Sequence, residues 1–206
     1  MKKQLLLLLI PVLAFNLVGQ AQGITDAERK AAIKNLKTTQ KDLLSSIRGL
    51  STEQLNFKSS PESWSIAECV EHIAISETNI FQGMIQGTLK AEATPEKRSE
   101  VKLSGDGVYD AIVDRTYKVK TQEAFVPTGK FGTHDATVAE FLNKRKANIE
   151  YLETTSDDLH GHYFTFPVEA LGTVDSYQLF YFMSGHSKRH TLQIEEVKSN
   201  AAFPAK

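Results

Sequence analysis

Residues 176–199 read SYQLFYFMSGHSKRHTLQIEEVKS, and their apolar side chains recur at the spacing of an α-helix. One set of positions follows intervals of four, three, four, four and three residues: Leu179, Met183, His186, His190, Ile194 and Val197. Positions with this spacing lie on one face of a helix. The stretch therefore predicts a helix whose apolar face includes His186 and His190.

Three more segments show helical patterns, and each begins with a hydroxyl residue three positions before a glutamate, the signature of a capping box. The pairs are Thr25 with Glu28, Ser65 with Glu68, and Thr137 with Glu140. With the first stretch they predict four helices, over residues 26–50, 66–89, 138–154 and 176–199. These helices would be roughly 25–38 Å long.

Four helices of similar length, each with an apolar stripe that needs a partner, favour an all-α four-helix bundle. Residues 108–121 predict one short extra helix. Proline and glycine mark long connecting loops, which include residues 94–107 and 156–175. Because no segment alternates with period two, we expect no sizeable β-sheet.

The composition is that of one folded domain and excludes several classes of protein. The chain has 206 residues, a formal charge of −1 and a single cysteine. Without a basic surplus, we expect no binding to nucleic acid. One cysteine excludes an internal disulfide framework and a cysteine-rich zinc module.

The first 21 residues have the pattern of a secretory signal. Lys2 and Lys3 precede an apolar run over residues 5–18, and Gly19 and Ala21 provide small residues for cleavage. The run is shorter than the roughly 20 residues of a membrane-spanning helix. We therefore expect a signal peptide over residues 1–21 and a mature domain over residues 22–206, exported to the periplasm or the extracellular space. We expect no stable membrane insertion after cleavage, and a retained anchor is the alternative.

A third histidine can join the pair on the last helix. His72 lies at one edge of the apolar face of the helix over residues 66–89. If these two helices are neighbours, His72, His186 and His190 can converge, and three imidazoles with open positions suit a catalytic divalent metal. Alternatively, they are separate core or surface histidines, which could bond to Glu68 or Glu71.

Two parts of the chain resemble the DinB-like superfamily. The first is WSIAECVEHI at residues 64–73. The second comprises Phe166-Pro167, Leu171-Gly172 and GHSKRHTLQI at residues 185–194. The resemblance covers about residues 25–200.

The resemblance implies a four-helix bundle of up-down-down-up topology that holds a divalent metal, zinc or nickel, on three histidines. The family's ligand positions match His72, His186 and His190. Relatives include thiol S-transferases and members of unknown activity, and several form homodimers, so the resemblance also allows a homodimer here.

Other polar residues have roles that stay open at this point. Glu68 could orient His72 or only complete the Ser65 capping box, and Gln193 could bond to a ligand histidine or cross-link helices. We expect Cys69 to behave as a small buried hydrophobe, and Arg189 to form an ion pair. No general acid or base is evident, although Asp175 or His162 could serve from a loop.

Two functions fit these features. The first is a metal-dependent enzyme, a hydrolase or a thiol transferase, that activates water or a thiol on an unknown small-molecule substrate. The alternative is a bundle that binds a metal or small ligand without turnover. No phosphate loop or dinucleotide motif favours a different chemistry.

Overall fold

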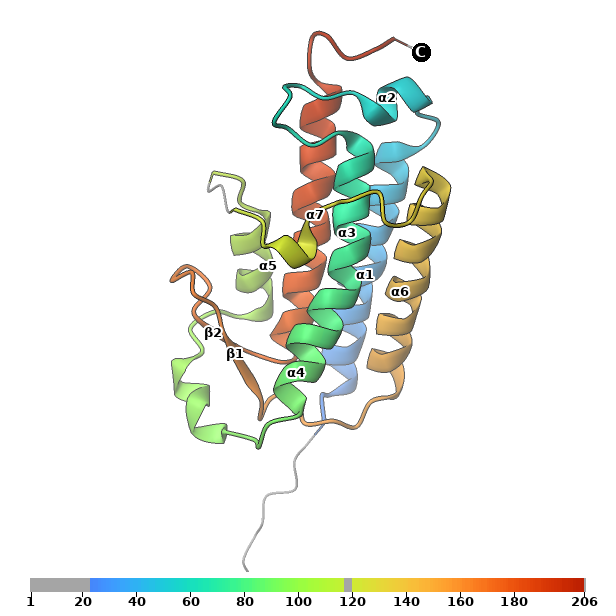
Figure 1. Cartoon of the computed structure of the whole chain (residues 1–206). Helices are drawn as coiled ribbons and strands as arrows, with labels where there is room; N and C mark the ends of the chain where they lie inside the picture. The colour runs from blue at the N-terminus through green and yellow to red at the C-terminus, as the bar shows by residue number, and fades with distance from the viewer. Residues whose placement is uncertain (1–22, 117–119, 206) are drawn as a thin grey trace, which may run out of the picture.

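In the computed structural model, which describes residues 23–116 and 120–205, four long helices pack side by side. They are α1 (Asp26–Ile47), α3 (Ile66–Asn79), α6 (His134–Thr154) and α7 (Gln178–Lys198). Figure 1 shows α1 and α7 running upward, and α3 and α6 running downward. The expected four-helix bundle of up-down-down-up topology is confirmed. The expected signal peptide, residues 1–21, lies outside the described residues.

Shorter elements connect and extend these helices. The π-helix η1 (Ile80–Ile85) and α4 (Gln86–Leu89) continue α3, so the helix expected over residues 66–89 is continuous. The remaining elements are α2 (Thr52–Asn56), the 3₁₀ helix η2 (Pro95–Glu100), α5 (Gly105–Val113), the 3₁₀ helix η3 (Glu123–Phe125), and strands β1 (Tyr163–Thr165) and β2 (Thr173–Asp175). None of the described helices is long and apolar enough to cross a membrane.

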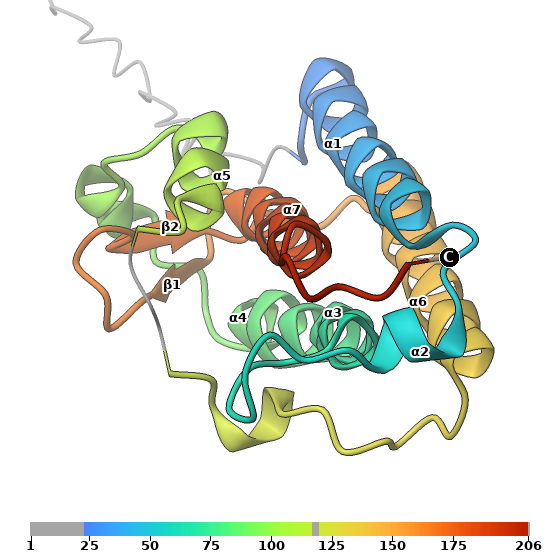
Figure 2. The ribbon, with the colours of Figure 1, turned by 90° about the horizontal axis from the view of Figure 1, so that it is seen from above.

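The neighbours around the bundle are α1 beside α7, α7 beside α3, α3 beside α6, and α6 beside α1. Seen from above in Figure 2, α7 lies between α1 and α3. The antiparallel neighbours α3 and α7 carry the three histidines. On the outer side, α5 packs closely against α7 at Gly185, where a Cβ atom would lie 2.9 Å from the carbonyl oxygen of Tyr109.

Two of the three capping boxes predicted from sequence are present, and the third prediction is wrong. Thr25 with Glu28 and Ser65 with Glu68 cap α1 and α3. The cap of α6 is Thr133, whose Oγ1 accepts a hydrogen bond from the Ala136 amide. Thr137 lies inside α6 instead, and its hydroxyl donates a hydrogen bond to the Thr133 carbonyl.

Other expected boundaries also shift. Helix α1 ends at Ile47, because Arg48 has an extended conformation with a ψ of 124°, and Gly49 follows with a φ of 69°. Helix α5 spans Gly105–Val113 instead of residues 108–121. It begins earlier because the Ser104 hydroxyl caps it by accepting from the Gly107 amide, and residues 117–119 of the expected helix lie outside the described residues. Strands β1 and β2, of three residues each, form an antiparallel hairpin inside the expected loop over residues 156–175. The sheet is as small as the sequence indicated.

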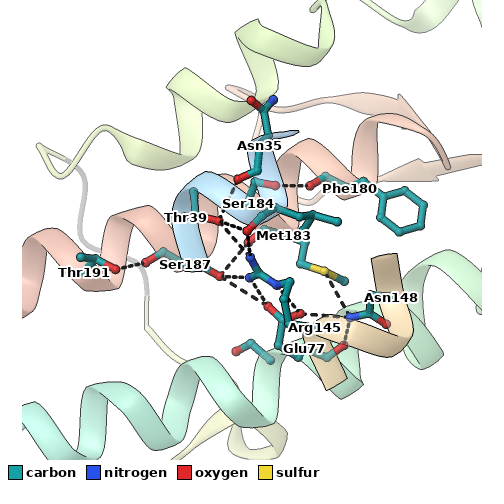
Figure 3. A network of polar contacts seen from close by, with 12 residues as sticks. Asn35, Thr39, Glu77, Arg145, Asn148, Phe180, Met183, Ser184, Ser187 and Thr191 are labelled. Atoms are coloured by element: carbon teal, nitrogen blue, oxygen red, sulfur yellow. Dashed lines mark hydrogen bonds and ion pairs between the residues drawn. The ribbon is translucent and has the colours of Figure 1, made fainter. Parts of the chain in front are cut away.

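A buried charged network joins all four long helices (Figure 3). Arg145 of α6 and Glu77 of α3 are fully buried and form an ion pair in which the Arg145 Nε lies 2.9 Å from a Glu77 carboxylate oxygen. The five N–H groups of Arg145 have five acceptors: two oxygens of Glu77, the Leu36 carbonyl, Thr39 Oγ1 and Ser187 Oγ. Since every guanidinium donor is used, the network is complete in itself.

Candidate metal centre

Three imidazoles meet between α3 and α7. His72 projects from the first half of α3, and His186 and His190 occupy positions one turn apart on α7. The Nε2 atom of His72 lies 3.1 Å from the Nε2 atom of His186 and 3.1 Å from that of His190. Among the described residues, these three form the one group of histidine, cysteine and acidic side chains arranged to hold a metal ion.

Hydrogen bonds on the far side of two rings fix their tautomers. His72 Nδ1–H donates to the Phe125 carbonyl at 2.7 Å, and His190 Nδ1–H donates to Gln193 Oε1 at 2.9 Å. A neutral imidazole that is protonated on Nδ1 has a lone pair on Nε2. Both lone pairs are therefore directed into the same small space between the helices.

Burial keeps these rings neutral. It lowers the pKa of His72 to about 4, although the hydrogen bond to Phe125 acts in the opposite direction. Burial also holds the pKa values of His186 and His190 well below their ordinary range, and the neighbouring imidazoles add to this. Neutral imidazole is the form that binds metals.

The donor set fits a divalent cation. At Zn–N distances of about 2.0–2.1 Å, tetrahedral ligand nitrogens are about 3.3–3.4 Å apart. The two Nε2 separations of 3.1 Å around His72 are close to this value. The Nε2 lone pairs of His72 and His190 cannot hydrogen-bond to each other, so a cation between them would convert a repulsive contact into an attractive one.

Aromatic rings pack beside the three histidines. The Trp64 ring lies 4.7 Å from the His72 ring and 5.9 Å from the His190 ring, between centroids. Phe182 stacks on His186 at 6.1 Å, and Phe125 lies 6.4 Å from His72. A low-polarity surround of this kind strengthens electrostatic interactions within the site.

Gln193 and Glu68, the two residues considered as supports for the ligand histidines, have different roles. Gln193 holds His190, as described above. Glu68 does not orient His72, because its carboxylate accepts from the Ser65 amide at 2.7 Å and from Lys58 at 2.8 Å. Both ring nitrogens of His72 have other partners, so Glu68 has only the capping role.

Neither loop residue considered as a general base bonds to the three imidazoles within the described part of the chain. The Asp175 carboxylate accepts from Arg98 and from His160, and His162 Nδ1 bonds to the Thr88 carbonyl. Burial raises the pKa of the Cys69 thiol to about 12, which agrees with its reading as a small hydrophobe. Arg189 donates to the carbonyls of Ile112 and Asp114 at the end of α5.

The fold and the cluster define a class: a helical bundle with three inward-facing histidines on two antiparallel helices. A family model for the DinB superfamily matches residues 35–194, and the chain belongs to that superfamily. No curated protein matches the chain significantly.

Among solved structures, the chain is similar to YfiT from Bacillus subtilis, which is described as a probable metal-dependent hydrolase with an unusual four-helix bundle topology. The TM-score is 0.58 at 14% sequence identity, and the match covers 88% of this chain and 91% of that chain. This similarity supports the fold.

Sequence reasoning missed two parts of the site. Phe125 acts through its backbone carbonyl, for which side-chain patterns give no signal. Glu71 was considered only as a carboxylate partner of a histidine, whereas its carboxylate accepts three amide hydrogen bonds from residues 128–130. The segment after Phe125 contains Pro127 and Gly129, which are typical of a loop but give no information about its position over α3.

Proposed function

We propose that the chain is a metal-dependent hydrolase in which His72, His186 and His190 bind one divalent cation, zinc or nickel. The observation that carries the proposal is the convergence of their nitrogens, with two Nδ1–H groups bonded away from the centre. A divalent cation at this position supplies Lewis acidity, which polarises a carbonyl and acidifies water.

The protein's own groups prepare the site for this chemistry. The Phe125 carbonyl and Gln193 hold two imidazoles in the ligand tautomer, and burial prevents protons from competing for them. Three neutral ligands leave the full charge of a bound cation available to a substrate. Trp64 and Phe182 provide apolar surface beside the centre.

The test begins with the metal content of protein from which any affinity tag has been removed. We expect one zinc or nickel ion per chain in the wild type and none in His186→Ala. His134→Ala is the matched control, because His134 lies outside the cluster and its Nδ1 makes no hydrogen bond within the described residues. This control should bind metal as the wild type does.

Turnover is then measured on the metal-loaded protein with a panel of carboxylic esters and amides. We expect hydrolysis by the wild type and by His134→Ala, and at least a 100-fold loss in His186→Ala. Equal activity in His186→Ala would contradict the proposal. Stoichiometric metal without hydrolysis would also contradict it, and would favour a binding bundle or, if a thiol and an electrophile react, a transferase.

A further inference from the structure

The segment over residues 123–130, which precedes α6, is fastened along the outer face of α3. Figures 1 and 2 both show this segment, which includes η3, crossing α3 before it reaches α6. Its Phe125 carbonyl accepts the Nδ1–H of His72. The position of this carbonyl therefore depends on whatever holds the segment in place.

Glu71, the neighbour of His72 in sequence, binds one end of the segment. Its carboxylate accepts the amide N–H groups of three consecutive residues: Thr128 at 3.1 Å, Gly129 at 2.9 Å and Lys130 at 2.8 Å. Gly129 has a φ of 73°, a left-handed conformation that glycine adopts without strain. Successive amides that converge in this way form a concave anion-binding nest.

The other end of the segment is held by Asn79, also on α3. Its Nδ2 donates to the Ala124 carbonyl at 2.7 Å. Phe125 thus lies between two anchors, Asn79 on one side and Glu71 on the other. Phe125, whose carbonyl bonds to His72, comes directly after Ala124, the residue that Asn79 holds.

The burial of Glu71 is costly unless its hydrogen bonds are made. The residue is 6% exposed, and a buried carboxylate loses its hydration. Three charge-assisted hydrogen bonds from the loop offset that loss, and they exist only while the segment lies against α3. The carboxylate and the segment therefore hold each other in one arrangement.

We propose that Glu71 is a positioning residue for the three-histidine centre. By fastening residues 123–130 against α3, it places the Phe125 carbonyl so that His72 is protonated on Nδ1 and offers its Nε2 lone pair to the centre. The consequence for metal binding rests on the proposed function, whereas the tautomer of His72 does not.

The test uses Glu71→Gln, which keeps the shape of the side chain but turns an NH₂ group toward one of the three amides. The matched control is Glu68→Gln, one turn earlier in the first part of α3, since Glu68 bonds to Ser65 and Lys58 instead of the segment. The first readout is the ¹⁵N chemical shifts of the His72 imidazole in metal-free protein, which report the tautomer. The second is the zinc dissociation constant, measured by competition with a chelator.

We expect the Nδ1–H tautomer of His72 in the wild type and in Glu68→Gln. In Glu71→Gln we expect a mixture of tautomers and zinc affinity reduced by about 10–100-fold, the usual effect of losing a group that orients a ligand. An unchanged tautomer in Glu71→Gln, together with zinc affinity close to that of the wild type, would overturn the proposal.

Two further outcomes remain decisive. If the wild type binds no zinc, the proposed function fails, but the tautomer comparison still decides the role of Glu71. If Glu71→Gln does not fold, Asn79→Ala releases the other end of the segment, and an unchanged His72 tautomer in that variant would refute positioning by the segment.

Discussion

Two buried polar clusters lie at the interface of the long helices, and they differ in how their hydrogen-bonding groups are matched. In the Arg145–Glu77 network, five donors of one side chain meet five acceptors, and the charges of the pair cancel. In the histidine cluster, the acceptor Nε2 atoms of His72 and His190 face one another at 3.1 Å. The first cluster is complete without a ligand, whereas the second gains from a cation.

The two clusters also share a helix pair. Glu77 follows His72 on α3 by five residues, and Ser187 is adjacent to His186 on α7. The Arg145–Glu77 network connects α3 and α7 next to the three imidazoles. We therefore interpret the Arg145–Glu77 network as structural support and the histidine cluster as the binding site.

Breaking the Arg145–Glu77 network should have the largest effect on stability. Arg145→Met leaves the Glu77 carboxylate buried without its partner, which we expect to cost about 3–5 kcal/mol in the free energy of unfolding. The double variant Arg145→Met with Glu77→Leu removes both charges and should recover most of that loss. Urea unfolding measures both, and a single variant within about 1 kcal/mol of the wild type would refute a structural role for the pair.

Metal addition should act on the other cluster only. With free zinc at a hundred times its dissociation constant, the wild type should gain about 2.7 kcal/mol of stability, and a chelator should reverse the gain. His186→Ala should show no gain at the same zinc concentration. The same stabilisation in both proteins would mean that zinc binds elsewhere.

Removing the partner of one imidazole should have a smaller effect. Gln193→Leu deprives the His190 Nδ1–H of its acceptor, so we expect zinc affinity to fall about 10-fold. Gln193→Glu retains an acceptor oxygen and should bind zinc at least as well as the wild type. Chelator competition separates these variants, and wild-type affinity in Gln193→Leu would show that this hydrogen bond is irrelevant to the site.

A partly exposed ionic cluster gives the smallest expected effect. His160 bonds to Asp175 and lies 3.2 Å from Glu28, and the Asp175 hydrogen bond raises the pKa of His160 above its ordinary value. Since the pKa of His160 is raised in the folded state, the stabilisation from its ionic contacts is fully present below pH about 6.5. It is lost as the pH rises through the pKa that His160 has in the folded protein.

The variant His160→Gln tests this pH dependence of stability. The difference in melting temperature between the wild type and the variant should be larger at pH 6 than at pH 9. Because the pair is partly solvated, we expect less than about 1 kcal/mol at either pH. A difference that does not change with pH would show that the ionic contacts of His160 contribute nothing to stability.

The sequence predicts the bundle and the two histidines of α7 because both depend on local spacing. His186 and His190 occupy the apolar stripe, and a buried imidazole at such a position needs a partner. The position of His72 on the apolar face of its own helix makes it a candidate. Its assignment to the same site depends on the resemblance to a family, since spacing along one helix gives no information about which helix lies opposite.

The Arg145–Glu77 pair and the Phe125 carbonyl are not predicted by local sequence patterns. Arg145 follows the same stripe as Phe141, Asn148 and Leu152, so its spacing contained a signal of burial, although a charged residue on a helix is usually solvated. Its partner Glu77 lies on a different helix, 68 positions away. The Phe125 carbonyl contributes through the backbone alone, and its position depends on how the Glu71 carboxylate and Asn79 hold a loop.

The most direct test of the account is the anomalous scattering of zinc in crystals of the zinc-loaded protein. We predict a single strong peak at about 2.0–2.1 Å from one nitrogen each of His72, His186 and His190. No peak at this position, or a peak bound by other residues while the three imidazoles turn away from one another, would contradict the claim that these histidines form one metal centre.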